Sequence, residues 1–277
     1  MKIAIVGCGW LGLPLAHSLQ KSGHSIVGTR RSEAGCSELR SLGFTGVQFE
    51  LGATLTEDKF AAIFSCDLLV LNIPVGRKTS SSEEFIANMH ALLKKAFDSN
   101  IKQVIFISTT SVYGNQNTVI SEKSLTVPNT SSGKINLMVE QIVQRYFIAQ
   151  ATILRPAGLV GDDRHPAHYL AGKTELASPN KVVNLVHQHD VIQSIESIIQ
   201  NDVWGHTLVL SALEHPTRQD YYRWAAEQLN IAAPAFIEEV GTPNGKFIDA
   251  NSSLDILGMQ LKYASPYDML SSPQPVL

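Results

Sequence analysis

The sequence predicts an α/β protein with a doubly wound parallel sheet and a smaller C-terminal lobe. In residues 1–155, short β-branched runs alternate with longer segments of helical periodicity. Strands that alternate with helices form parallel sheets covered by helices on both faces. From residue 157 to 180 the alternation gives way to a Gly-, Pro- and His-rich stretch. A stretch of this length without regular structure is typical of a functional loop.

The alternation comes from six strand-like and five helix-like segments. The strand-like segments are short, apolar and rich in Val and Ile, and turn-forming residues bound them. The helix-like segments repeat apolar residues every three or four positions. The predicted strands are 2–7, 24–29, 46–51, 67–74, 103–109 and 151–156, and the helices between them are 11–22, 33–42, 57–64, 83–98 and 133–147. Further along, strands are predicted at 181–187 and 205–212 and helices at 190–200 and 217–229.

Composition and charge exclude several function classes. Of the 277 residues, 44% are apolar and 17% are charged, which is typical of a folded globular protein. The net charge of −3 provides no basic excess for nucleic acid or an anionic membrane surface, and no apolar run reaches the roughly 18 residues of a membrane helix. Cys8, Cys36 and Cys66 match neither a zinc-site nor a disulfide pattern, and HQH at 187–189 offers only two metal ligands. We expect a cytoplasmic protein without a metal.

Three glycines directly follow the first predicted strand. Gly7, Gly9 and Gly12 form a GxGxxG motif. The first glycine permits a tight turn, the second lets the backbone approach a pyrophosphate, and the third lets the helix pack closely on the sheet. The backbone of Trp10 and Leu11 completes the turn, and the N–H groups and dipole of the following helix favour an anion there. The motif predicts a Rossmann-type site for a dinucleotide.

The end of the second predicted strand indicates which dinucleotide binds. A site for NAD usually carries Asp or Glu there, which accepts from the ribose 2′-hydroxyl. This chain has Arg30 and Arg31, followed by Ser32, and a guanidinium forms charge-assisted hydrogen bonds with a 2′-phosphate. NADP(H) is therefore favoured, with NAD as the alternative. Arg77 and Lys78 follow the fourth predicted strand and are either phosphate contacts or solvated loop charges.

The segment 104–114, VIFISTTSVYG, resembles the fifth strand of the extended short-chain dehydrogenase/reductase family, the NAD(P)-dependent epimerases and dehydratases. LRPAGLVG at 154–161 is similar to the RPxxxYG motif of that family, LVHQHDV at 185–191 to FxHVxDV, and GHTLVLSA at 205–212 to GxxYNxG. Within the family the chain is most similar to the bacterial YeeZ-type group, which has the short GxGxxG. The resemblance implies a small polar or nucleotide-linked substrate. It also leaves open a homodimer through the helices at about 83–98 and 133–147.

The resemblance further implies a catalytic Tyr four residues before a Lys on one helix face, with a Ser or Thr on the fifth strand. Thr109 matches the Ser/Thr position. Matching the lysine to Lys134, which would bind the nicotinamide ribose, puts Thr130 in place of the tyrosine. A threonine hydroxyl cannot supply the same proton, because it titrates far above the tyrosine pKa of about 10. Tyr113, the nearest phenol in the sequence, is a candidate substitute.

The irregular stretch, which covers the substrate by resemblance, offers further candidates. His165 is the first of them, because histidine transfers protons near neutral pH. Arg164, His168 and Tyr169 lie beside it, and the ordinary alternative is a loop turn with solvated charges. In the HxxDV motif, by contrast, His187 is expected to fix the entry to a helix.

Two functions stay open from the sequence. The first is an NADP-dependent oxidoreductase or epimerase/dehydratase-like enzyme with an unusual proton donor. The second is a catalytically silent NADP(H)-binding sensor or scaffold, which the missing tyrosine favours, together with Val160 in place of the tyrosine of RPxxxYG. In either case we expect 1–155 to bind the dinucleotide and 156–277 to form the substrate-binding lobe. The strand and helix at about 181–200 are expected to return to the main sheet.

Overall fold

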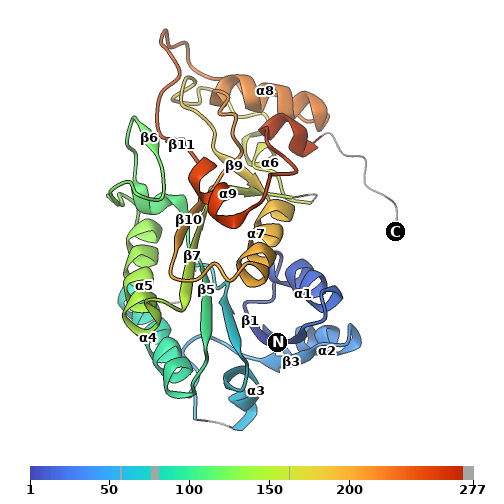
Figure 1. Ribbon diagram of the computed structural model, residues 1–277. Coiled ribbons are helices and arrows are strands. Elements are labelled where there is room, and N and C mark those ends of the chain that lie inside the picture. The colour runs from blue at the N-terminus through green and yellow to red at the C-terminus, as the bar shows by residue number, and fades with distance from the viewer. Residues whose placement is uncertain (57, 76–80, 162, 271–277) are drawn as a thin grey trace.

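A parallel sheet of seven strands forms the centre of the molecule in this computed structural model, which describes residues 1–56, 58–75, 81–161 and 163–270 (Figure 1). Its strand order is β10-β7-β5-β4-β1-β2-β3, and all neighbouring pairs are parallel. The strands are β1 (Lys2–Val6), β2 (Ser25–Arg30), β3 (Thr45–Gln48), β4 (Leu68–Leu71), β5 (Gln103–Ile107), β7 (Ala151–Pro156) and β10 (Thr207–Leu210). The predicted doubly wound sheet is confirmed.

Helices cover both faces of the sheet, as the continuous apolar strand sequences require. Successive side chains of a strand point to opposite faces, so Ile3 and Ile5 of β1 lie in one core cluster and Ala4 and Val6 in the other. The first cluster includes side chains of α1 (Gly12–Lys21), α2 (Glu33–Ser41), α7 (Gln188–Gln200) and α9 (Asn251–Leu257). The second cluster includes α3 (Ala61–Phe64), α4 (Ser82–Asp98) and α5 (Ser131–Phe147), with the 3-10 helix η1 (Asp58–Phe60).

The second lobe lies beyond the carboxyl ends of the main strands (Figure 1). Two small parallel sheets build part of it: β8 (Gly158–Val160) with β9 (Leu185–His187), and β6 (Val119–Ile120) with β11 (Phe247–Ile248). A third core cluster joins the helices of this lobe. They are α6 (Ala167–Leu170), α8 (Arg218–Gln228) and the 3-10 helix η3 (Pro266–Leu270).

One expected strand takes a different place. The strand predicted at 181–187 does not return to the main sheet, because β9 pairs with β8 in the second lobe. The strand that does return is β10, which pairs with β7 at the sheet edge. The helix that follows β9 does return, since α7 packs on α1. The division at residue 155 stays a prediction.

Two further observations concern the described part of the chain. Within residues 1–56, 58–75, 81–161 and 163–270, no helix is both long and apolar enough to cross a membrane. Arg77 and Lys78 lie outside these residues.

Candidate functional site

The glycine turn after β1 has the close packing that the motif predicts. Gly7 has φ +99°, and a Cβ there would lie 2.2 Å from the Asn72 carbonyl oxygen. The Asn72 side chain in turn donates to the Gly7 carbonyl over 3.0 Å. A Cβ at Gly12 would lie 2.6 Å from the Gly7 carbonyl oxygen. Both positions therefore need glycine, because any side chain would push β1, β4 and α1 apart.

The middle glycine faces open space. A Cβ at Gly9 would meet no atom of the described protein within 4 Å, although the Gly9 N–H itself bonds to the Gly7 carbonyl. The N–H groups of Trp10 and Leu11 have no acceptor among the described residues, and no side chain caps α1. Free N–H groups at the start of a helix form an anion site. This turn fits the pyrophosphate of a dinucleotide, which a side chain at Gly9 would obstruct.

The two arginines lie at the carboxyl end of β2, close to the glycine turn. The Thr29 hydroxyl accepts from the Gly7 N–H over 2.9 Å, so the end of β2 and the turn are directly joined. The Arg30 side chain is 24% exposed, and its guanidinium lies 3.5 Å from the Glu38 carboxylate. Its Nε is buried without a partner among the described residues. Arg31 is exposed, and both cations lie at the end of β2, the position at which Rossmann-type sites contact the adenosine ribose.

Thr109 follows β5 and begins the 3-10 helix η2 (Thr110–Tyr113). Its hydroxyl oxygen accepts from the Ser111 N–H over 3.1 Å and lies 2.7 Å from the Ser111 hydroxyl. The residue is half-buried at the carboxyl edge of the sheet, where ligands of doubly wound folds bind. A hydroxyl held in this way can orient a substrate oxygen.

Tyr113 lies in the core. Its side chain has no exposed surface, and its hydroxyl accepts from Arg155 over 2.7 Å. Arg155 also binds the Glu140 carboxylate through two hydrogen bonds of 3.0 and 2.6 Å, and the Ser108 hydroxyl donates to the same carboxylate. Burial raises the pKa of the Tyr113 phenol. A buried, hydrogen-bonded phenol does not reach a substrate, so the structure contradicts the expected donor role. The network instead joins η2, α5 and β7.

His165 is also buried, contrary to its expected place facing a substrate. Its Nδ1 accepts from the Ala167 N–H over 3.2 Å, so the proton is on Nε2, which donates to the Tyr221 hydroxyl over 2.8 Å. The Tyr221 hydroxyl then donates to the Pro266 carbonyl. Burial, and to a smaller extent the neighbouring His168, lower the pKa of His165 to about 4. This neutral imidazole links α6, α8 and η3 and has no free atom for proton transfer.

The HxxDV motif has the structural role that was expected. His187 caps α7 by accepting from the His189 N–H over 3.1 Å. Asp190, also buried, accepts from the N–H groups of Lys262 and Tyr263 and so ties α7 to the C-terminal segment. Within the described part of the chain, no group of three or more His, Cys, Asp or Glu side chains could hold a metal ion.

Trp10 makes a contact that sequence reasoning missed. Its indole N–H donates to Asp163 over 2.6 Å, and the Arg164 guanidinium lies 5.0 Å from the ring centroid. The Trp10 carbonyl accepts from Gln188. A Cβ at Gly161 would lie 2.5 Å from the indole, so the ring packs directly on that backbone. No local pattern signals this contact, because it joins residues more than 150 positions apart.

A cavity of about 490 Å³ in the second lobe carries unpaired positive charge. Arg164, Lys181 and Arg218 line it, and none of the three forms an ion pair among the described residues. Tyr169 and Tyr222 also line it, and no Asp or Glu does. Such a lining is suited to an anion beside a flat ring.

Comparison with known proteins identifies the family. The model of the NAD dependent epimerase/dehydratase family matches residues 3–180. The chain belongs to this family. It is 33% identical over 270 residues to Protein YeeZ of Escherichia coli K12, covering 97% of this chain and 98% of YeeZ. These matches confirm the family that the motifs indicated.

Solved structures share the fold across nearly the whole chain. UDP-glucuronic acid 4-epimerase from Bacillus cereus, in complex with NAD, has a TM-score of 0.78 and 18% identity, with 98% of this chain and 96% of that chain covered. A functionally unknown conserved protein from Silicibacter pomeroyi DSS has a TM-score of 0.76 and 20% identity, with the same coverage of both chains. The predicted Rossmann-type fold is therefore that of NAD-dependent epimerases.

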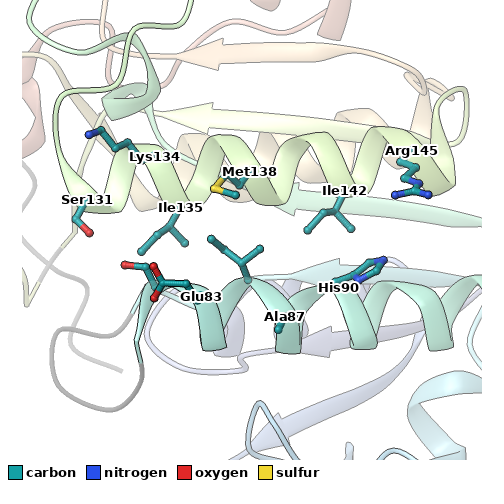
Figure 2. A pocket seen from close by; sticks show the side chains of 11 residues that line it. Glu83, Ala87, His90, Ser131, Lys134, Ile135, Met138, Ile142 and Arg145 are labelled. Atoms are coloured by element: carbon teal, nitrogen blue, oxygen red, sulfur yellow. The ribbon is translucent and has the colours of Figure 1, made fainter.

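Lys134 does not occupy the place expected of the family lysine. It is exposed and borders a groove between α4 and α5, which Met138 and Arg145 also line (Figure 2). The face of α5 that meets the sheet carries Asn136 and Glu140, which are buried. At about 100° per residue, Lys134 lies about 200° from Asn136 around the helix. Lys134 thus lies on the side of α5 opposite to Asn136 and Glu140.

Ser132, which is exposed, and Asn136, which is buried, have the spacing of the family's Tyr and Lys and lie one turn apart on α5. Asn136 donates to the Ser132 carbonyl over 2.9 Å and lies one turn before Glu140, whose carboxylate meets Ser108 at the end of β5. Thr130, which had been matched to the tyrosine, is the N-cap of α5 and accepts from the Gly133 N–H. The sequence signal that would have pointed to Asn136 instead of Lys134 is the set of positions that form the buried face of α5. Neither Ser132 nor Asn136 is ionisable, so this pair supplies neither the family's tyrosine nor its lysine.

Proposed function

We propose that this family member is an NADP(H)-preferring oxidoreductase or epimerase/dehydratase-like enzyme. The observation that carries the preference is the pair Arg30 and Arg31 at the end of β2, beside the glycine turn. A 2′-phosphate accepts charge-assisted hydrogen bonds from guanidinium groups, whereas a carboxylate in this place would repel it. The Arg30 Nε is buried and has no partner among the described residues, which supports a ligand oxygen as its acceptor. Glu38 is 55% exposed and offers only a weak competing ion pair.

The substrate that fits best is small, polar and anionic, with a nucleotide-linked sugar as the leading class. Arg164, Lys181 and Arg218 would bind its phosphate or carboxylate groups, and Tyr222 offers a ring beside them. In support, the Bacillus cereus epimerase of the same fold is described with UDP-glucuronic acid and NAD. Residues 156–277 would form most of the substrate-binding lobe, and residues 1–155 the cofactor domain.

The residues of this chain would divide the work between binding and orientation. The nicotinamide cofactor would supply hydride exchange with a substrate carbon. The turn at Gly9 and the start of α1 would bind the pyrophosphate, and the Thr109 hydroxyl would orient the substrate oxygen. Trp10 would hold Arg164 beside the cavity, so the cofactor turn and the substrate lobe meet directly.

The test is calorimetric titration with NADPH and, separately, NADH. NADPH should bind at least tenfold more tightly, a difference of about 1.4 kcal/mol. Arg30→Ala with Arg31→Ala should remove this difference, while the control Arg223→Ala, an exposed arginine on α8, should not. Equal affinity for both cofactors would reject the preference. No binding of either would reject the cofactor assignment.

A cofactor-binding sensor without turnover is the second candidate. The pair Ser132 and Asn136 in place of the family's Tyr and Lys, with Tyr113 and His165 buried, favours it. Such a protein would bind NADPH with the same preference and convert no substrate. Turnover by the unmodified protein of any nucleotide sugar would reject it.

We also propose a homodimer through the groove between α4 and α5 (Figure 2). The groove has a volume of about 620 Å³ and contains Ile86, Ile135, Met138 and Ile142. Met138 is 48% exposed, and covering such apolar side chains favours association. In sedimentation experiments Met138→Glu should convert dimer to monomer, whereas Val240→Glu in the second lobe should not. A monomeric unmodified protein would reject the dimer.

The compartment that fits these features is the cytoplasm. Cys8, Cys36 and Cys66 are all buried as free thiols, which favours a reducing environment.

A further inference from the structure

Lys246 reaches the edge of the site from a distant part of the chain. Its Nζ donates to the Thr110 carbonyl over 2.8 Å, and Thr110 directly follows Thr109. The lysine immediately precedes β11, which pairs with β6, and Figure 1 shows these two strands side by side. The ammonium group thus lies at the turn that carries the substrate-orienting hydroxyl.

The backbone around Lys246 is held on both sides. The Asn184 side chain donates to the Lys246 carbonyl over 2.9 Å and accepts from the Ile248 N–H over 3.0 Å. The Gly245 N–H donates to Asn117. Asn184 also lines the cationic cavity of the second lobe. Lys246 is therefore placed between that cavity and the Thr109 turn.

The surroundings of Lys246 leave its charge without a partner. No carboxylate pairs with it among the described residues. The charged group that acts on it is Lys181 from the cavity wall, while η2 and Asn184 present only uncharged polar groups. Burial, and to a smaller extent the charge of Lys181, lower the pKa of Lys246 to about 8. Both protonation states are therefore accessible near neutral pH, as an acid/base group requires.

We propose that Lys246 is the catalytic acid/base residue of this site, in place of the tyrosine and lysine that α5 lacks. This inference rests on the proposed function. During reduction of a substrate carbonyl, for which a bound nicotinamide cofactor would supply the hydride, an N–H bond of the Lys246 ammonium would break as the O–H bond of the product forms. The neutral amine then takes a proton from water. During oxidation the neutral amine accepts the hydroxyl proton.

The first test measures the titration of Lys246 in the full chain by NMR of isotope-labelled lysine side chains, with and without NADPH. Lys246→Arg assigns the signal by removing it. We expect one lysine to titrate near pH 8. A Lys246 signal that titrates with the surface lysines, above about pH 10, overturns the proposal, because the amine would then be fully protonated at neutral pH.

The second test measures turnover of UDP-glucose, UDP-glucuronic acid and UDP-N-acetylglucosamine with NADP⁺ or NADPH. Lys246→Met and Lys246→Arg should each lower kcat about 10²- to 10⁴-fold, with NADPH affinity and thermal unfolding unchanged. Lys123→Met, an exposed lysine after β6, is the matched control. Full activity in Lys246→Met overturns the Lys246 role and leaves the proposed function intact. If the unmodified protein binds NADPH but turns over none of the three, both proposals fail. If it does not bind NADPH, the cofactor assignment fails first.

Discussion

The buried ion pair beneath the candidate site is expected to be a major determinant of stability, and Glu140→Gln is the change that tests it. The Arg155 and Glu140 side chains are only 7% and 2% exposed, and Arg155 also donates to the buried Tyr113 hydroxyl. Removing the carboxylate charge leaves the Arg155 guanidinium uncompensated in the core. Loss of one partner of a buried pair costs about 3–5 kcal/mol, and because glutamine keeps some hydrogen bonds we expect about 3 kcal/mol.

The assay is urea denaturation followed by circular dichroism, which gives the free energy of unfolding. The control is Asp98→Asn, which breaks the exposed pair of Lys94 and Asp98 on α4 and should leave the free energy of unfolding nearly unchanged. Arg155→Met should cost about as much as Glu140→Gln. The double variant should lose less than the sum of the two, because no unpaired charge remains. A loss below 1 kcal/mol for Glu140→Gln would refute the reasoning.

Three further predictions concern the cofactor turn, α5 and the second lobe. Gly9→Val should abolish NADPH binding in calorimetry but change the free energy of unfolding by less than about 1 kcal/mol, because its side chain enters open space; weak destabilisation with normal binding would contradict the pyrophosphate site. Lys134→Ala should leave NADPH affinity within twofold, since Lys134 is exposed and lies on the side of α5 opposite to the buried Asn136, and a tenfold loss would restore its cofactor role. His165 has its pKa lowered to about 4 in the folded protein, so between pH 6.5 and pH 4 the unfolded chain binds more protons. Stability should therefore fall as pH drops through this window, by about 3 kcal/mol from this group, and His165→Gln should flatten that part of the stability profile.

The α/β fold and the cofactor turn could be predicted because their signals are local. Alternating apolar runs specify strands and helices. Gly7 and Gly12 lie within a few residues of the first strand, and the turn after that strand requires glycine at both positions. The place of the two arginines could also be predicted, because they come directly at the end of an apolar strand, and β2 ends at Arg30. These patterns depend on periodicity and turn geometry, which neighbouring residues along the chain determine.

The catalytic side of the site could not be predicted in the same way. Tyr113 and His165 have suitable chemistry in the sequence, but burial against Arg155 and Tyr221 decides what their polar atoms can reach. Whether Lys134 or Asn136 takes the place of the family's lysine depends on which face of α5 meets the sheet. A Tyr and a Lys spaced four residues apart can lie on any face, so the spacing alone does not identify it.

The sequence by itself determined the order of strands and helices, the dinucleotide turn and the family. Only the tertiary structure decided which ionisable groups lie near the candidate site. The physical reason is the separation of the partners along the chain: Lys246 meets the Thr110 carbonyl across 136 residues, and Trp10 meets Asp163 across 153. Contacts of that range arise from the packing of whole elements, which no local pattern encodes.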